Sequence, residues 1–159
     1  MSDRPVRETN RPMSQGGPPD TSVTTVRLIG HDNALSRRLG WRFADLGMSV
    51  IATRFSEIDP DHFRFDDLRD DFVIVDLGWS GTETDLGLAV LFRIVPPEAT
   101  SARVCRVIVL APWFDPATRP AWAELGVWLV VDRATPPPEI AGAVQRLLAE
   151  SHDKANRSA

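Results

Sequence analysis

The amino-acid sequence predicts an α/β fold, a doubly wound, five-stranded parallel sheet with helices on both faces. The chain has 159 residues, enough for one domain with a sizeable core. Five short apolar runs, rich in β-branched residues, alternate with segments in which apolar residues recur at helical spacing. Strands that alternate with helices along one chain are typical of a parallel sheet covered by helices on both sides.

The predicted domain spans residues 24–150. Residues 1–23 are rich in proline, glycine, serine and arginine and have no apolar period, so we expect a disordered N-terminal tail. Residues 151–159 are expected to form a polar C-terminal tail. The five predicted strands are residues 24–29, 48–53, 72–75, 103–110 and 127–131. The third is apolar throughout, which is typical of a strand covered on both faces.

The helices are predicted from caps and apolar spacing. The first is capped by Asp32 or Asn33, and the next segment, residues 54–70, is expected to hold only a short helix. Residues 85–95 form another helix capped by Thr84, and a short one follows Asp115 and Pro116. It contains Pro120, which should shorten or kink it, and the apolar stripe Ala117, Ala121 and Leu125. The last helix buries four residues, Ile140, Val144, Leu147 and Leu148.

The helix at residues 85–95 is apolar on almost every side. A helix that is apolar on every side is expected to be buried on every side, whereas a helix packed on a sheet should have one solvent-exposed side. We therefore expect the tails or a second subunit to cover it. Leu91 and Phe92 are candidate interface residues, and a homodimer is one expected assembly.

Composition narrows the classes of function. The net charge is -4, from 18 basic and 22 acidic residues, which argues against a nucleic-acid-binding surface. The N-terminus has no apolar signal core and no apolar run reaches the roughly 18 residues that a membrane span needs, so a cytoplasmic location without a membrane partner is expected. The single cysteine, Cys105, lies in an apolar run and is expected to be a buried structural thiol.

Six residues follow the predicted strands at their carboxyl ends, where ligands gather in such sheets. They are the polar or charged residues His31, Asp32, Asp76, Asp132 and Arg133, and Ala111. Asp32 and Asp76 can share a magnesium ion, with Arg133 pairing an incoming phosphoryl group and Asp76 accepting it. Alternatively, Asp32 caps the first helix, and Arg133 forms an ion pair with Asp76 that stabilises the site.

The order of these features resembles a response-regulator receiver domain over residues 26–148. The resemblance rests on five short matches: Val73-Ile74-Val75-Asp76, Leu86-Gly87-Leu88, Val107-Ile108-Val109-Leu110, residues 126–133, and Pro136-Pro137-Pro138-Glu139-Ile140. It implies a flavodoxin-like sheet of strand order 2-1-3-4-5 and a role in two-component signalling or a phosphorelay. It also implies that Asp76 is the phosphoacceptor.

The sequence departs from the receiver pattern at several positions. The two consecutive acids of the family are replaced by His31-Asp32, and its hydroxyl residue by Ala111. The family lysine falls on Arg133, the aromatic switch position falls on Val130, and the loop after Asp76 is longer. Only Asp32 and Asp76 remain of the core chemistry, which is the pattern of a degenerate pseudo-receiver.

The leading hypothesis is a stand-alone, non-enzymatic signalling module that binds protein partners such as a kinase or regulator. Its candidate contact residues, expected to be exposed, are Trp41, Trp113, Phe114 and Trp122. The alternative is an atypical response regulator phosphorylated on Asp76, with magnesium as its only cofactor. A third possibility is a small-molecule-binding flavodoxin-like domain, although the chain has no phosphate-binding glycine loop and no nucleophile beside His31 and Asp76.

Overall fold

A computed structural model describes residues 23–59, 71–95 and 106–157 of the chain. Its centre is a sheet of order β2-β1-β3-β4-β5. Every neighbouring pair of strands is parallel, which confirms the predicted fold class and strand order. The strands are β1 (Thr25–Gly30), β2 (Ser49–Arg54), β3 (Phe72–Asp76), β4 (Arg106–Ala111) and β5 (Leu129–Asp132).

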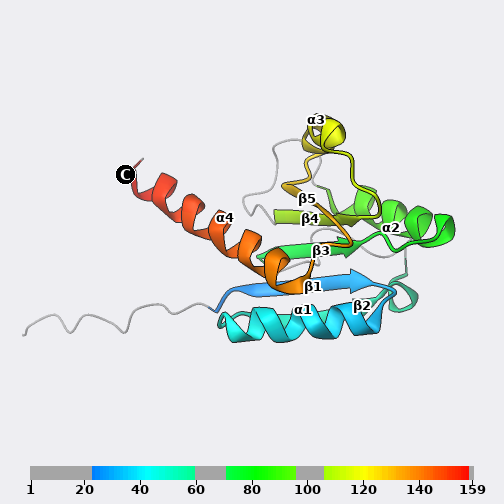
Figure 1. Cartoon of the computed structure of the whole chain (residues 1–159), viewed down its shortest axis with the longest axis horizontal. Coiled ribbons are helices and arrows are strands. Elements are labelled where there is room, and N and C mark those ends of the chain that lie inside the picture. The colour runs from blue at the N-terminus through cyan, green and yellow to red at the C-terminus, as the bar shows by residue number, and fades with distance from the viewer. Residues whose placement is uncertain (1–22, 60–70, 96–105, 158–159) are drawn as a thin grey trace, which may run out of the picture.

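Helices cover the sheet on both faces (Figure 1). One face packs against α1 (Asn33–Asp45) and α4 (Pro137–Arg157), and the other against α2 (Gly81–Ile94). Two 3-10 turns, η1 (Phe55–Glu57) and η3 (Pro116–Thr118), and the short helix α3 (Arg119–Glu124) complete the described elements. Within the described ranges, no helix is long and apolar enough to cross a membrane.

The central strand β3 separates two apolar cores. Val73 and Val75 point into the core beneath α2, whereas Phe72 and Ile74 point into the core beneath α1 and α4. All five residues of β3 are buried, as the continuous apolar run predicts. The strand therefore holds its last residue, Asp76, at a fixed place between the two layers.

The predicted start of the helix after β3 is wrong. The helix begins at Gly81, and its N-cap is Ser80, whose hydroxyl accepts a hydrogen bond from the Glu83 backbone N–H at 3.2 Å. The Glu83 carboxylate accepts in return from the Ser80 N–H at 3.1 Å, which completes a capping box. Thr84 lies inside the helix and donates its hydroxyl to the Leu77 carbonyl instead.

The expectation that this helix is buried all round is also wrong for a single copy of the chain. Leu91 is fully buried and is therefore removed from the candidate interface residues. Leu86 and Phe92 are 47% and 60% exposed, so an apolar stripe of α2 faces solvent. The sheet takes up only the opposite side of the helix, which carries Gly87, Val90, Leu91 and Ile94.

The other elements differ from the predictions in their detail. The predicted stripe of α3 is wrong, because Ala117, Ala121 and Leu125 are exposed and Trp122 packs toward the core instead. Helix α4 continues to Arg157 and so includes residues assigned to the polar C-terminal tail (Figure 1). Nearly all of the predicted N-terminal tail, part of the segment 54–70, and Cys105 lie outside the described residues.

Candidate functional site

Three charged side chains meet at the carboxyl edge of the sheet. Asp32 follows β1, Asp76 ends β3, and Arg133 follows β5. The backbone N–H of Arg133 donates to the Ala111 carbonyl at 2.9 Å, which continues the ladder between β4 and β5 and directs the arginine toward β3. The sheet thus brings together residues that lie far apart in the sequence.

Arg133 and Asp76 form a buried, bidentate ion pair. Arg133 Nε donates to Asp76 Oδ1 at 2.6 Å, and Nη2 donates to Asp76 Oδ2 at 3.0 Å. The two side chains are only 5% and 9% exposed. This side-by-side geometry is the strongest form of charge-assisted hydrogen bonding between an arginine and a carboxylate.

Two glycines adapt the backbone to this ion pair. Gly78, with a positive φ of 72°, turns the chain so that its N–H donates to Asp76 Oδ1 at 2.9 Å. A side chain at Gly30 would place its Cβ 3.0 Å from the Cβ of Asp76, so a glycine lets the carboxylate lie close to β1. Both oxygens of Asp76 consequently have protein donors.

The Asp32 carboxylate binds both the N-terminus of α1 and the guanidinium of Arg133. Its Oδ1 caps α1, accepting from the backbone N–H groups of Ala34 at 2.8 Å and Leu35 at 3.0 Å. Its Oδ2 lies 3.2 Å from Arg133 Nη2. The Leu35 N–H, together with Ala34 and Arg133, outweighs partial burial and lowers the pKa of the Asp32 carboxyl.

The guanidinium of Arg133 stays charged in this site. Burial opposes the charge, but the hydrogen bonds and charges of Asp76 and Asp32 outweigh it and raise the pKa of Arg133. Its Cζ also lies 4.7 Å from the centre of the Trp79 ring, a cation–π contact. Trp79 in turn meets Trp113 edge-on, with ring centres 5.6 Å apart. Trp79 was not among the predicted site residues.

The remaining predicted site residues do not join the charged cluster. The His31 ring lies 4.4 Å from Phe55, and its buried Nε2 finds no hydrogen-bond partner in the described part of the chain. Asp132 accepts from the Ala134 N–H at 2.8 Å and so stabilises the turn after β5. The described residues contain no group of three or more His, Cys, Asp or Glu side chains that could hold a metal ion.

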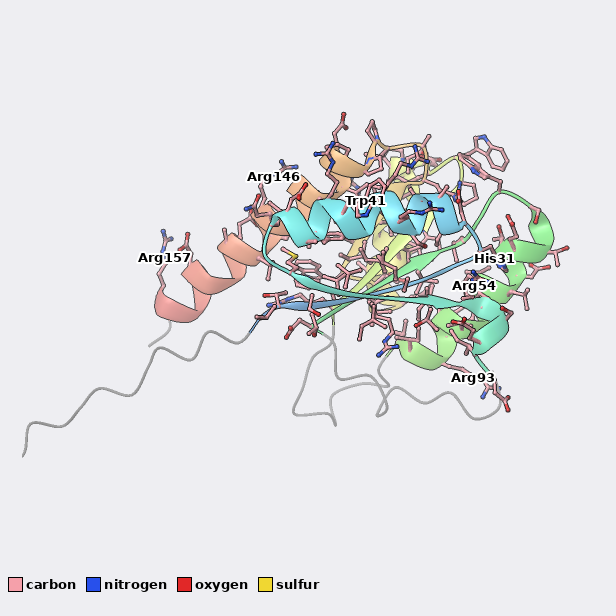
Figure 2. All side chains as sticks on the ribbon, turned by 90° about the horizontal axis from the view of Figure 1, so that it is seen from below. His31, Trp41, Arg54, Arg93, Arg146 and Arg157 are labelled. Carbon is pink, nitrogen blue, oxygen red and sulfur yellow. The ribbon has the colours of Figure 1, made fainter. Side chains whose placement is uncertain are left out.

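The candidate contact residues divide into exposed and packed side chains. Trp113 is 76% exposed, and Trp41 is 64% exposed on the outer side of α1 (Figure 2). Phe114 and Trp122 are only partly exposed because they pack against the core beneath α2. The expectation of a free surface is therefore wrong for these two residues.

Replacing Asp32 with alanine is expected to lower the free energy of unfolding by about 1 kcal/mol, because the α1 cap is lost. Asp32→Asn should cost less, since asparagine is also a good N-cap. Urea denaturation of the three proteins at pH 7 measures the difference.

The same variants carry a pH test. The pKa of Asp32 is lowered in the folded chain, so the charged carboxylate contributes stability at neutral pH that is lost as pH falls below about 4. The difference in the free energy of unfolding between wild type and Asp32→Asn should become smaller over that range. A gap that stays constant with pH would show that the charge of Asp32 contributes nothing.

Comparisons with known proteins show what this fold resembles. No family model and no curated protein matches the sequence. A response regulator from Thermotoga maritima matches the structure with a TM-score of 0.59 at 17% identity, covering 80% of this chain and 98% of that one. The Vibrio cholerae chemotaxis protein CheY4 matches with a TM-score of 0.56 at 12% identity, covering 79% and 98%.

A third match is also a receiver domain protein. The CheY-like receiver domain protein from Methanospirillum hungatei has a TM-score of 0.57 at 12% identity, covering 84% of this chain and 99% of that one. These identities are low, so the likeness concerns the fold alone. The chain has the fold of response-regulator receiver domains.

Proposed function

We propose that this chain is a receiver-like signalling module that acts by binding protein partners, without phosphorylation of Asp76 as its switch. The observation that carries the proposal is the buried bidentate ion pair between Arg133 and Asp76. It corresponds to the second of the two interpretations that the sequence left open, in which Asp32 caps a helix and Arg133 neutralises Asp76.

Phosphoryl transfer to a carboxylate needs a free oxygen as the attacking atom and a cation to offset charge. Both oxygens of Asp76 already accept hydrogen bonds, from Arg133 and from the Gly78 N–H. The guanidinium lies against both carboxylates, so the residues as arranged do not fit a magnesium ion. A cation that displaced Arg133 would leave a buried guanidinium without its partner, which costs several kcal/mol.

Two further positions support the same proposal. Ala111 is buried at the end of β4 and has no hydroxyl that could hydrogen-bond a phosphoryl group. His31 stands where a second acid would supply another hard oxygen ligand, and its ring packs against Phe55. The site is therefore suited to holding the edge of the sheet in one arrangement.

The exposed aromatic residues support a role in protein binding. Trp41 lies on α1 beside Arg37, Arg38 and Arg42. Trp113 is exposed and contacts Trp79, whose ring lies over Arg133. Tryptophan and arginine are enriched among the residues that dominate binding energy at protein interfaces. A regulatory role is accordingly better supported than a catalytic one.

The test is incubation with magnesium and a small phosphodonor such as phosphoramidate, read by intact mass. We expect no stoichiometric gain of a phosphoryl group by the wild-type chain. The total tryptophan fluorescence, to which Trp79 over Arg133 contributes, should also stay unchanged on adding magnesium. A phosphorylatable receiver treated in parallel shows that the donor is active.

Asp76→Asn is the matched control. If the wild type gained one phosphoryl group and Asp76→Asn gained none, the proposal would be wrong. The alternative function, an atypical response regulator phosphorylated on Asp76, would then hold.

A further inference from the structure

Helix α2 presents an exposed stripe with an apolar centre. Its exposed residues from the second helical position onward are Thr82, Asp85, Leu86, Ala89, Phe92 and Arg93. Leu86, Ala89 and Phe92 recur every three residues, and because three residues of a helix turn through about 300°, they spread over one side of it. The opposite side is buried on the sheet. Two large exposed apolar side chains on one stripe mark it as a candidate contact surface.

The stripe is symmetric about Ala89. Leu86 and Phe92 lie three residues before and after it, and Asp85 and Arg93 lie four residues before and after it. At a rise of about 1.5 Å per residue, these pairs stand roughly 4.5 Å and 6 Å along the helix axis from the centre. Figure 2 shows Arg93 near the C-terminal end of the helix.

This pattern complements itself when two copies of α2 pack antiparallel. A two-fold axis that passes beside Ala89 sets Leu86 of one copy level with Phe92 of the other. The same axis sets Asp85 level with Arg93, so opposite charges share a level. A parallel arrangement would instead set Asp85 level with Asp85. Alanine at the centre lets the two helices approach closely, because its side chain is small.

We propose that the exposed stripe of α2 is a homodimer interface, occupied by α2 of a second copy of this chain in an antiparallel, two-fold arrangement. The contact is isologous, so it closes as a dimer and does not extend into a filament. Since it uses neither Asp76 nor Arg133, its success or failure is independent of the proposed function.

The area of the proposed interface sets the expected affinity of the dimer. A helix of 14 residues is about 21 Å long, so the pair of helices buries an area at the low end for specific interfaces, below about 1,200 Å² in total. Interfaces of this size are typically transient. The dimer is therefore expected to form with a dissociation constant in the micromolar to millimolar range, and the test must cover that range of concentration.

Disulfide cross-linking tests the position of the two-fold axis. In a Cys105→Ala background, which removes the only native cysteine, Ala89→Cys places one thiol at the centre of the stripe. Ala123→Cys is the matched control, because Ala123 is also an exposed alanine on a helix. With oxidised glutathione as the oxidant, the Ala89→Cys protein should form covalent dimers at least about five-fold faster, since only close, aligned cysteines can be bridged. Equal rates for the two proteins would overturn the proposal.

Sedimentation between about 10 µM and 500 µM measures the association itself. The wild-type average mass should rise with concentration, and Ala89→Glu should abolish the rise because two glutamates would face each other across the axis. Leu125→Glu, which adds a charge at an exposed apolar residue on another part of the surface, should leave the rise unchanged. A wild type that stays monomeric, as it would if another part of the chain covered the stripe, overturns the proposal. So does association that Ala89→Glu does not weaken.

Discussion

Replacing Arg133 with methionine is expected to lower the free energy of unfolding by about 3–5 kcal/mol at pH 7. The substitution leaves the Asp76 carboxylate buried without its guanidinium, while most of the side-chain volume is kept. Asp76 then retains the Gly78 N–H as its only donor among the described residues. Because the total stability of a domain is typically about 5–15 kcal/mol, the loss should be visible as a large shift in the urea midpoint.

Arg146→Met on α4 is the control, because Arg146 is exposed and the change should stay within about 0.5 kcal/mol. An Arg133→Met protein as stable as wild type at pH 7 would mean that the ion pair does not hold the edge of the sheet.

The fold was predictable because each element has a local signal. The run from Phe72 to Val75 is apolar throughout. The amphipathic spacing of Leu35, Leu39, Phe43 and Leu46 predicts the buried face of α1, although Leu46, at the end of the helix, is exposed. The elements were found in the right order even where their ends differed by a few residues. The strand order needed the resemblance to receiver domains, because parallel strands carry no sequence signal for their neighbours.

The wrong start of α2 had a signal that was overlooked. Ser80 and Glu83 form the pattern of a capping box, and this pair competes with Thr84 as the start of the helix. The helix starts after Ser80 because the capping box satisfies the backbone N–H groups of both Ser80 and Glu83. The Glu83 carboxylate also accepts from the Trp79 N–H at 2.8 Å. The exposed stripe of α2 had no such signal, because the sequence does not show whether an apolar side chain is covered by a neighbour or exposed to solvent.

The three charged residues of the site were predictable from the sequence, but how their side chains pair was not. Strand ends placed Asp32, Asp76 and Arg133 at one edge, and both a metal site and an ion pair fitted that placement. Whether a metal site or an ion pair forms depends on where the side chains point, which residue spacing does not encode. The backbone bond from Arg133 to Ala111 and the Trp79 ring over the guanidinium orient Arg133. Phe114 and Trp122 were misjudged for a similar reason, because a loop can fold an aromatic ring back onto the core.

Removing both partners of the ion pair should be far less damaging than removing one. Asp76→Leu alone leaves the buried Arg133 with only Asp32, a partner whose side chain is about one-third exposed, and should cost several kcal/mol. The double variant Asp76→Leu with Arg133→Met replaces the pair by two apolar side chains. Its loss in free energy of unfolding should be much smaller than the sum of the losses of the two single variants. The difference is a coupling energy of about 3 kcal/mol or more between the two positions. Urea denaturation of the four proteins completes the cycle.

The double variant also separates structure from signalling. About 1 kcal/mol should remain unrecovered, because the Gly78 N–H loses its acceptor. If the carboxylate and guanidinium only hold the edge of the sheet, this protein should keep the circular dichroism spectrum and the concentration-dependent mass of the wild type. Additive losses, with no recovery in the double variant, would instead show that the two residues do not act as a pair. Recovery would show that the two residues stabilise the fold as a pair and that neither fold nor association needs a carboxylate at position 76.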